Sequence, residues 1–92
     1  MNTAIVFITT AVDRVTGVAE EVAALDGVTE VYSVTGDIDL VAMVRTRDVE
    51  TIADVVTGQI NKVAGVTGTQ THLAFRAYST HDLEAAFAIG AE

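Results

Sequence analysis

The sequence contains no cysteine, no proline and no tryptophan, and it has only five Lys and Arg residues against thirteen Asp and Glu. Without cysteine there is no disulfide, no thiolate metal site and no thiol nucleophile. The net charge of −8 repels a phosphate backbone, which argues against direct binding to nucleic acid. No apolar run approaches the roughly 18 residues of a membrane span, and the first residues lack a cationic signal-peptide start. We therefore expect a cytoplasmic chain with no membrane partner.

Apolar residues, by contrast, are abundant. They make up 50% of the 92 residues, which is too large a share for a disordered chain. The length predicts a single domain over residues 1–92. A chain of this size hides only about 60–70% of its unfolded surface when it folds, so its own core is expected to be modest.

The first half of the chain predicts a strand, a helix and a second strand. Residues 4–8 are apolar without interruption, as in a strand that is buried on both faces. Apolar residues then recur at the three- and four-residue spacings of one helix face, at Val15, Val18, Val22 and Leu25. Asp13 is expected to cap this helix. Residues 28–35 alternate as in a strand, and Gly36 and Asp37 interrupt the pattern.

The second half repeats this order. Residues 39–46 predict a third strand with two apolar faces, and residues 67–78 predict a long fourth strand. Between them lies a helix that Thr46 or Asp48 is expected to cap. Its apolar stripe consists of Val49, Ile52, Val56, Ile60 and Val63. A short C-terminal helix follows the fourth strand, with an apolar side formed by Leu83, Phe87 and Ile89.

Both helices are followed by the same tripeptide, Gly-Val-Thr, at residues 27–29 and 65–67. Two strand–helix–strand units in tandem predict an α+β, ferredoxin-like βαββαβ fold. Right-handed crossovers place both helices on one face of a four-stranded antiparallel sheet. The first and third strands, which are central in this fold, are apolar on both faces. The face without helices therefore needs a cover, either a second copy of the chain or the C-terminal helix folded back.

Signals of catalysis are few. His72 shares a strand face with Gln70 and Arg76, and it is a conceivable base or metal ligand, but no second ligand has suitable spacing. Asp37 and Asp39 alone do not fill the coordination shell of Mg²⁺ or Ca²⁺. The sequence has no Gly-x-Ser-x-Gly elbow and no glycine-rich phosphate loop. We therefore expect no catalytic residue, no metal site and no cofactor.

Two motifs resemble a known family. From Val34 the chain reads Val-Thr-Gly-Asp-Ile-Asp-Leu-Val-Ala-Met-Val, and from Gly65 it reads Gly-Val-Thr-Gly-Thr-Gln-Thr-His-Leu-Ala-Phe. They resemble the effector-binding (RAM) domain of the Lrp/AsnC regulators. That family has a Gly-x-(aromatic)-Asp-Leu turn after its second strand and Gly-Val-x-x-Thr-x-Thr at the start of its fourth. The resemblance covers residues 3–78, and Ile38 stands where the family has an aromatic residue.

The resemblance implies a domain that dimerises through its sheets, assembles into rings of dimers and binds small effectors, usually amino acids. Carried over by motif, the ligand-binding candidates are Gly36, Asp37 and Asp39 in the turn and Thr69 and Thr71 in the fourth strand. Backbone N–H groups in a turn can hold a carboxylate, and an Asp can hold an ammonium group. The helix-turn-helix domain of the full-length regulators is not seen before the first strand. We therefore expect a stand-alone module that acts on transcription through a DNA-binding partner, such as a full-length Lrp/AsnC regulator.

An enzyme is the alternative interpretation. Small monooxygenases and isomerases of the dimeric α+β barrel type share this arrangement of strands and helices. Such an enzyme needs a polar constellation inside its cavity, and only Gln70, His72, Arg76 and Tyr78 could supply one. An ACT domain is less similar, because the chain lacks a Pro-Gly-type turn after the first strand.

Overall fold

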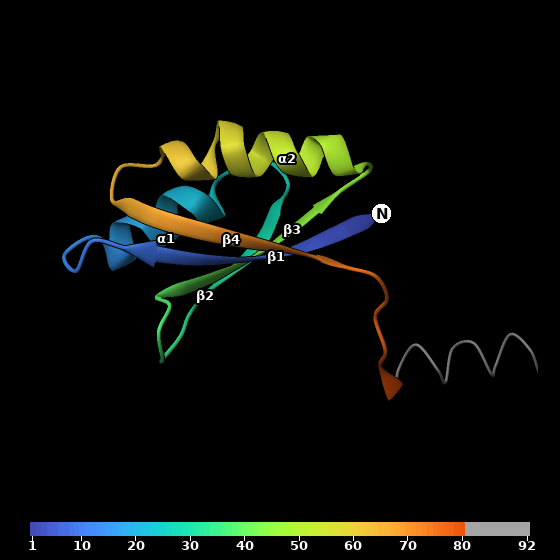
Figure 1. The fold of residues 1–92 in the computed structure, drawn as a ribbon, viewed down its shortest axis with the longest axis horizontal. Coiled ribbons are helices and arrows are strands. Elements are labelled where there is room, and N and C mark those ends of the chain that lie inside the picture. Colours follow the sequence, from blue (N-terminus) through green and yellow to red (C-terminus); the bar gives the residue numbers. More distant parts are fainter. Residues whose placement is uncertain (81–92) are drawn as a thin grey trace, which may run out of the picture.

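Two strand–helix–strand repeats interlock in one antiparallel sheet in the computed structural model, which describes residues 1–80 (Figure 1). The elements are β1 (Asn2–Thr10), α1 (Val15–Ala23), β2 (Val28–Ser33), β3 (Leu40–Thr46), α2 (Val49–Gly58), the 3₁₀ helix η1 (Ile60–Lys62) and β4 (Val66–Ala74). The strand order is β2-β3-β1-β4, so β1 and β3 are central. The predicted ferredoxin-like βαββαβ fold is confirmed. The predicted C-terminal helix lies outside the described residues.

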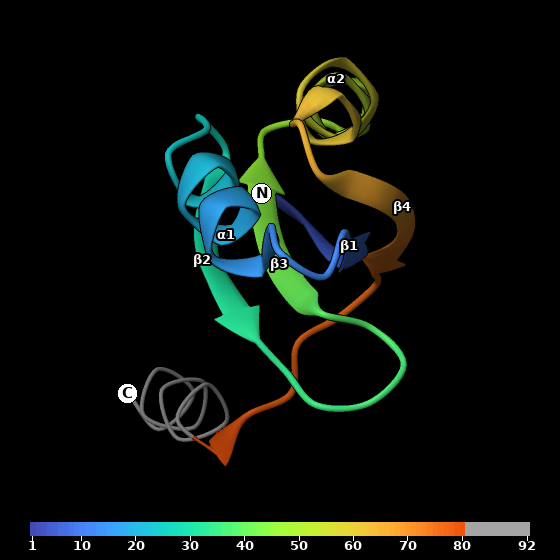
Figure 2. The same ribbon diagram turned by 90° about the vertical axis from the view of Figure 1, so that its left-hand side faces the viewer.

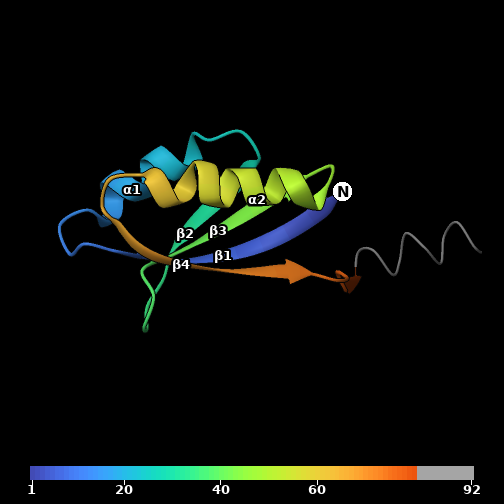
Figure 3. The same ribbon diagram turned by 45° about the horizontal axis from the view of Figure 1, so that its top comes forward.

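Both helices lie on the same face of the sheet (Figures 2 and 3). The core between the helices and the sheet consists of Ala4, Val6, Ile8, Val18, Val22, Leu40, Ala42, Val44, Ile52, Val55, Val56 and Ile60. These residues alternate along β1 and β3, as the period of a strand requires. The stripe predicted for the second helix is buried at Ile52, Val56 and Ile60, but Val55 is buried as well and Val49 is 49% exposed. Val49 is exposed because it is the first residue of α2, and this end of the helix extends past the core. The single helix predicted there is divided, because α2 ends at Gly58 and Ile60 belongs to η1.

The two helices begin differently. The Asp48 carboxylate caps α2, accepting hydrogen bonds from the Thr51 backbone N–H and hydroxyl, both at 2.7 Å. These bonds hold the pKa of Asp48 below its usual value. The prediction that Asp13 caps α1 is wrong. Arg14 occupies the cap position and its side chain makes no capping hydrogen bond to the helix, because the helix begins at Val15 and Asp13 lies in the preceding turn.

The fourth strand is shorter than the predicted 67–78. It ends at Ala74, which pairs with Thr3 near the start of β1, so little of β1 is left to pair with later residues. Residues 75–80, here called the arm, leave the sheet at this point. They descend past its end on the side opposite the helices (Figure 1).

The face of the sheet without helices, here called the open face, is largely apolar at its centre. The strand register places Ile5 and Phe7 of β1 beside Val41 and Met43 of β3, and all four side chains are partly exposed. Toward the edges the same face carries Glu30 and Tyr32 of β2, Arg45 of β3, and Gln70 and His72 of β4. Within the described residues, no element covers this face (Figure 3).

Candidate functional site

Three loops meet at the end of the sheet opposite the arm. The loop after β1 is joined to the loop before β4 by a hydrogen bond from Ala11 N–H to Gly65 O at 2.8 Å. The Arg14 guanidinium reinforces this junction with hydrogen bonds to Ala64 O at 3.2 and 3.3 Å. The turn between β2 and β3 is the third loop, and it descends on the side opposite the helices (Figure 1). The turn and the loop before β4 hold the two sequence motifs.

Asp39 anchors the β2–β3 turn to β1. Its Oδ2 accepts a hydrogen bond from Thr10 N–H at 2.8 Å, and its own N–H donates to Ile8 O at 3.0 Å. Its carbonyl accepts from Val34 N–H at 3.0 Å, which closes the turn. Among residues 1–80, Asp39 Oδ1 accepts no further hydrogen bond, so one carboxylate oxygen is available to a ligand.

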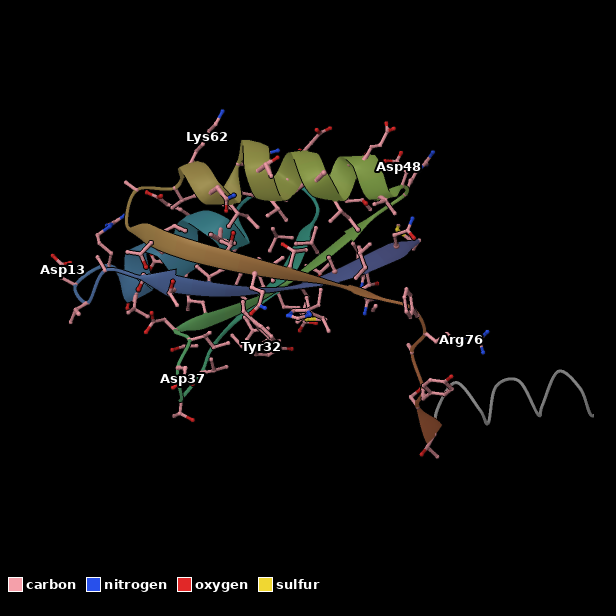
Figure 4. All side chains as sticks on the ribbon, in the orientation of Figure 1. Asp13, Tyr32, Asp37, Asp48, Lys62 and Arg76 are labelled. Carbon is pink, nitrogen blue, oxygen red and sulfur yellow. The ribbon has the colours of Figure 1, made fainter. Side chains whose placement is uncertain are left out.

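Gly36 and Asp37 form the tip of this turn. Gly36 has φ +111°, a conformation that favours glycine, and a Cβ built there meets no atom within 4 Å. The Asp37 side chain is exposed and points away from the sheet (Figure 4). The tip is therefore open to solvent and to any molecule that approaches the open face.

Ile38 and Thr69 line one hollow of about 220 Å³, together with Phe7, Thr9, Gly68 and Gln70. The hollow connects the β2–β3 turn with the start of β4, so the structure brings the two motifs together at this point. Its walls combine the apolar Phe7 and Ile38 with polar groups from β1 and β4. The Thr69 hydroxyl itself donates to Asn61 Oδ1 at 2.6 Å.

Thr71 lies elsewhere. It pairs with Val6 and lines a hollow of about 340 Å³ between β4 and α2, with Leu73 and an apolar row of α2 side chains. Thr69 and Thr71 share the helix side of β4, as their spacing predicts, because they pair with the buried Ile8 and Val6. The five candidates therefore form two groups. The three turn residues lie near Thr69, whereas Thr71 lies apart from them.

Two further hydroxyls belong to this end of the sheet, and the sequence analysis missed them. Thr67 donates to Thr9 Oγ1 at 3.0 Å, and Thr9 donates to Gly68 O at 3.3 Å. Next to them, a hollow of about 380 Å³ is lined by Asn61, Val66, Thr67, Gly68 and Thr69. The alternation of threonines at 67, 69 and 71 was a signal for Thr67, whereas Thr9 could be found only from the register of β1 against β4.

The residues considered for catalysis do not gather at one site. The His72 ring packs against Phe7 with centroids 5.0 Å apart, and Gln70 lies two residues before His72 in β4, also on the open face. Arg76 and Tyr78 belong to the arm, beyond the end of the strand, and Arg76 points away from the sheet (Figure 4). In the described part of the chain, no group of three His, Asp or Glu side chains is placed to hold a metal ion.

Tyr32 and Glu30 form a polar pair on the open face. The Tyr32 hydroxyl donates a hydrogen bond to the Glu30 carboxylate. This bond and the negative charge of Glu30 raise the pKa of Tyr32. Any partner that covers the open face therefore meets a carboxylate and a phenol that already satisfy each other.

None of the helices in residues 1–80 is long and apolar enough to cross a membrane. The sequence matches none of the curated proteins. It does match the profile of the Lrp/AsnC ligand binding domain over residues 3–83.

Solved structures resemble the chain over most of its length. TTHA0845 from Thermus thermophilus is 53% identical, with a TM-score of 0.81, over 86% of this chain and 99% of that one. PHS023 from Pyrococcus horikoshii is 30% identical, with a TM-score of 0.77, over 88% and 98%. The transcriptional regulator NMB0573 of Neisseria meningitidis, solved as a complex with L-Met, shares the fold at 18% identity, with a TM-score of 0.74, over 86% of this chain and 54% of that regulator. From the profile match and these identities, the chain belongs to the Lrp/AsnC ligand binding domain family.

Proposed function

We propose that the chain is a regulatory module that binds an amino acid at the end of the sheet formed by the β2–β3 turn and the start of β4. The observation that carries the proposal is Asp39, a carboxylate that β1 holds in place through one oxygen while the other has no partner among residues 1–80. That oxygen can accept a charge-assisted hydrogen bond from the ammonium group of a ligand. Backbone N–H groups of the turn around Gly36 and Asp37 would hold the ligand carboxylate.

The neighbouring hollow suggests where the ligand side chain lies. Its volume of about 220 Å³ and its two apolar walls, Phe7 and Ile38, suit a short apolar side chain, and Thr9 and Gln70 add polar walls. The Neisseria regulator complexed with L-Met has the same fold, which adds support for an amino acid as ligand. Thr71 is the least supported of the five candidates, because it lines a different hollow.

A screen of the twenty amino acids by thermal shift, followed by calorimetry, tests the proposal. Asp39→Asn is the informative variant, because the amide keeps an oxygen for Thr10 N–H and replaces the charged, unpaired oxygen with an NH2 group, which cannot accept a hydrogen bond from the ligand. Losing a charge-assisted hydrogen bond costs about 1.5–3 kcal/mol, so we expect roughly ten- to over a hundredfold weaker binding with an unchanged fold. Asp54→Asn, an exposed change on α2, is the matched control. Absence of binding by every amino acid, or equal affinity of Asp39→Asn, would refute the site.

We further propose that two copies associate through their open faces. Ile5, Phe7, Val41 and Met43 leave an apolar surface at the centre of the sheet that nothing in residues 1–80 covers. Each apolar side chain buried there stabilises a dimer by up to about 1.5–3 kcal/mol. Ile5→Glu should produce monomers in sedimentation equilibrium, because it buries an unpaired charge. Val12→Glu, at a 98% exposed position away from this face, should leave the dimer intact. A monomeric wild type at micromolar concentration would refute the association.

Rings of such dimers, and action on transcription through a DNA-binding partner such as a full-length Lrp/AsnC regulator, complete the proposal. The net charge of −8 opposes direct contact with DNA. An electrophoretic shift assay at low salt should therefore show no complex with the chain alone, and a salt-sensitive shift would refute this part of the proposal.

A further inference from the structure

The arm carries two aromatic side chains that have little contact with the rest of residues 1–80. Phe75 is 98% exposed and Tyr78 is 80% exposed. Nothing in the local fold requires aromatic residues at these places, since β4 has already ended at Ala74. Large side chains of this kind are enriched where a partner buries them, and they contribute much of the binding energy in protein interfaces.

The arm and the β2–β3 turn border the open face at its two ends. Both descend from the sheet on the side opposite the helices, the turn at one end and the arm at the other (Figures 1 and 4). A partner packed against the open face would therefore lie beside the arm. The arm extends outward and does not fold back over its own Phe7, Val41 and Met43, which remain partly exposed.

A hollow of about 360 Å³ lies where the arm meets the open face. Thr3, Ile5 and Met43 of the sheet line it on one side, and Phe75, Arg76 and Ala77 of the arm line it on another. A group that entered this hollow would touch the sheet and the arm at the same time. The surface that receives a partner is thus continuous from the open face onto the arm.

The charges at this hollow favour an acidic partner. Arg45 and Arg76, two of the five basic residues in the chain, border it, and the Arg76 side chain extends from the arm away from the sheet (Figure 4). A second copy of this chain carries thirteen acidic residues and a net charge of −8, so two copies repel each other at long range. Guanidinium groups at the contact surface offset that repulsion where the copies come closest.

We propose that the arm packs against a second copy of the chain, so that Phe75 and Tyr78 of each copy are buried by the other copy in the dimer. The inference rests on the proposed association through open faces and adds to it. In a two-fold dimer each substitution removes two equivalent contacts, so residues of the arm have a doubled effect on association.

The double variant Phe75→Ala/Tyr78→Ala tests this role. Both side chains are nearly free in the single chain, so the variant keeps the fold, which circular dichroism will verify. In sedimentation equilibrium over a dilution series we expect its dimer dissociation constant to rise at least about 100-fold. Val12→Ala is the matched control, because it removes an equally exposed apolar side chain far from the arm, and it should change the constant less than twofold.

A second measurement locates the contact directly. In a mixed dimer of isotope-labelled and unlabelled copies, filtered NOE spectra should show cross-peaks between the arm rings of one copy and methyl groups of the other. With only three Phe, two Tyr and two Met in the chain, these signals can be assigned. A dimer that the double variant leaves unweakened, or that lacks such cross-peaks, would overturn the arm's role while leaving association through the open faces intact. A monomeric wild type would overturn both.

Discussion

Replacing Gly65 with alanine should be the most damaging glycine substitution at the loop junction beside the candidate site. Gly65 has φ +103°, which L side chains rarely adopt. A Cβ built there lies 2.7 Å from Arg14 Cβ, 2.9 Å from Arg14 Cγ and 3.0 Å from Val18 Cγ2. The backbone of Gly65 is not free to move away, because its carbonyl accepts the hydrogen bond from Ala11 N–H at 2.8 Å.

The size of the effect follows from two costs. The left-handed backbone conformation costs a residue with a Cβ about 1–2 kcal/mol. The new methyl group also forces Arg14 away from its place, where its guanidinium binds Ala64 O. Losing hydrogen bonds from a charged, partly exposed group costs roughly another 1–2 kcal/mol. We therefore expect Gly65→Ala to destabilise the fold by about 2–4 kcal/mol.

Substitutions at two other glycines separate the cost of the backbone conformation from the cost of crowding Arg14. Gly36 has φ +111° but open space around its Cβ, so Gly36→Ala should cost only the backbone share, about 1–2 kcal/mol. Gly58 ends α2 without a positive φ and with open space around it, so Gly58→Ala should stabilise the fold by up to about 1 kcal/mol. Urea unfolding of the four proteins at one fixed concentration measures the series. Equal losses for Gly65→Ala and Gly36→Ala would refute the reasoning, because the crowding by Arg14 would then contribute nothing.

Asp48→Ala should lower the melting temperature by several degrees at neutral pH, because it removes the cap of α2. Since the folded pKa of Asp48 is lowered from 3.8, this stabilisation is complete above 3.8 and is lost as the pH falls through the folded pKa, so thermal melts of the two proteins should converge in acid. Ile60→Ala should destabilise the fold by about 2–5 kcal/mol in urea unfolding, because Ile60 is fully buried. A loss of unfolding free energy below about 1 kcal/mol would mean that η1 contributes little to the packing of the core. Glu30→Gln should move the alkaline absorbance titration of Tyr32 to lower pH, because Glu30 raises its pKa; an unchanged titration would contradict the pairing of the two side chains on the open face.

The fold could be predicted because its signals are local. The apolar run of β1, the three- and four-residue spacing of the helices and the repeated Gly-Val-Thr each depend on neighbouring residues. The errors arose where the answer depends on a partner far along the chain. The end of β4 is decided by where β1 begins, and Arg14, which takes the cap position predicted for Asp13, is held by Ala64 O, 50 residues away.

In the candidate site, too, features set by neighbouring residues could be predicted, whereas features set by distant residues could not. The turn at Gly36 and Asp39 was identified by its motif, and the structure adds that Asp39 is bonded to Thr10, a residue 29 positions away. The sequence predicts that Thr69 and Thr71 lie on one side of a strand. It does not reveal that Asn61 binds the first hydroxyl while α2 lies beside the second. These neighbours depend on how α2 and η1 cross the sheet, which no spacing in β4 encodes.

The central position of β1 has a consequence for the synthesis of the chain. β1 pairs with β3 on one side and with β4 on the other, and β4 begins only at Val66. While the ribosome is still making the residues before Val66, β1 is an edge strand with unpaired backbone groups. This edge is nine residues long and bears no charge and no proline, the devices that usually keep edges from pairing with other chains. Emergence of the last strand therefore removes the most aggregation-prone surface of the nascent protein, and chains truncated before Val66 should be found in inclusion bodies.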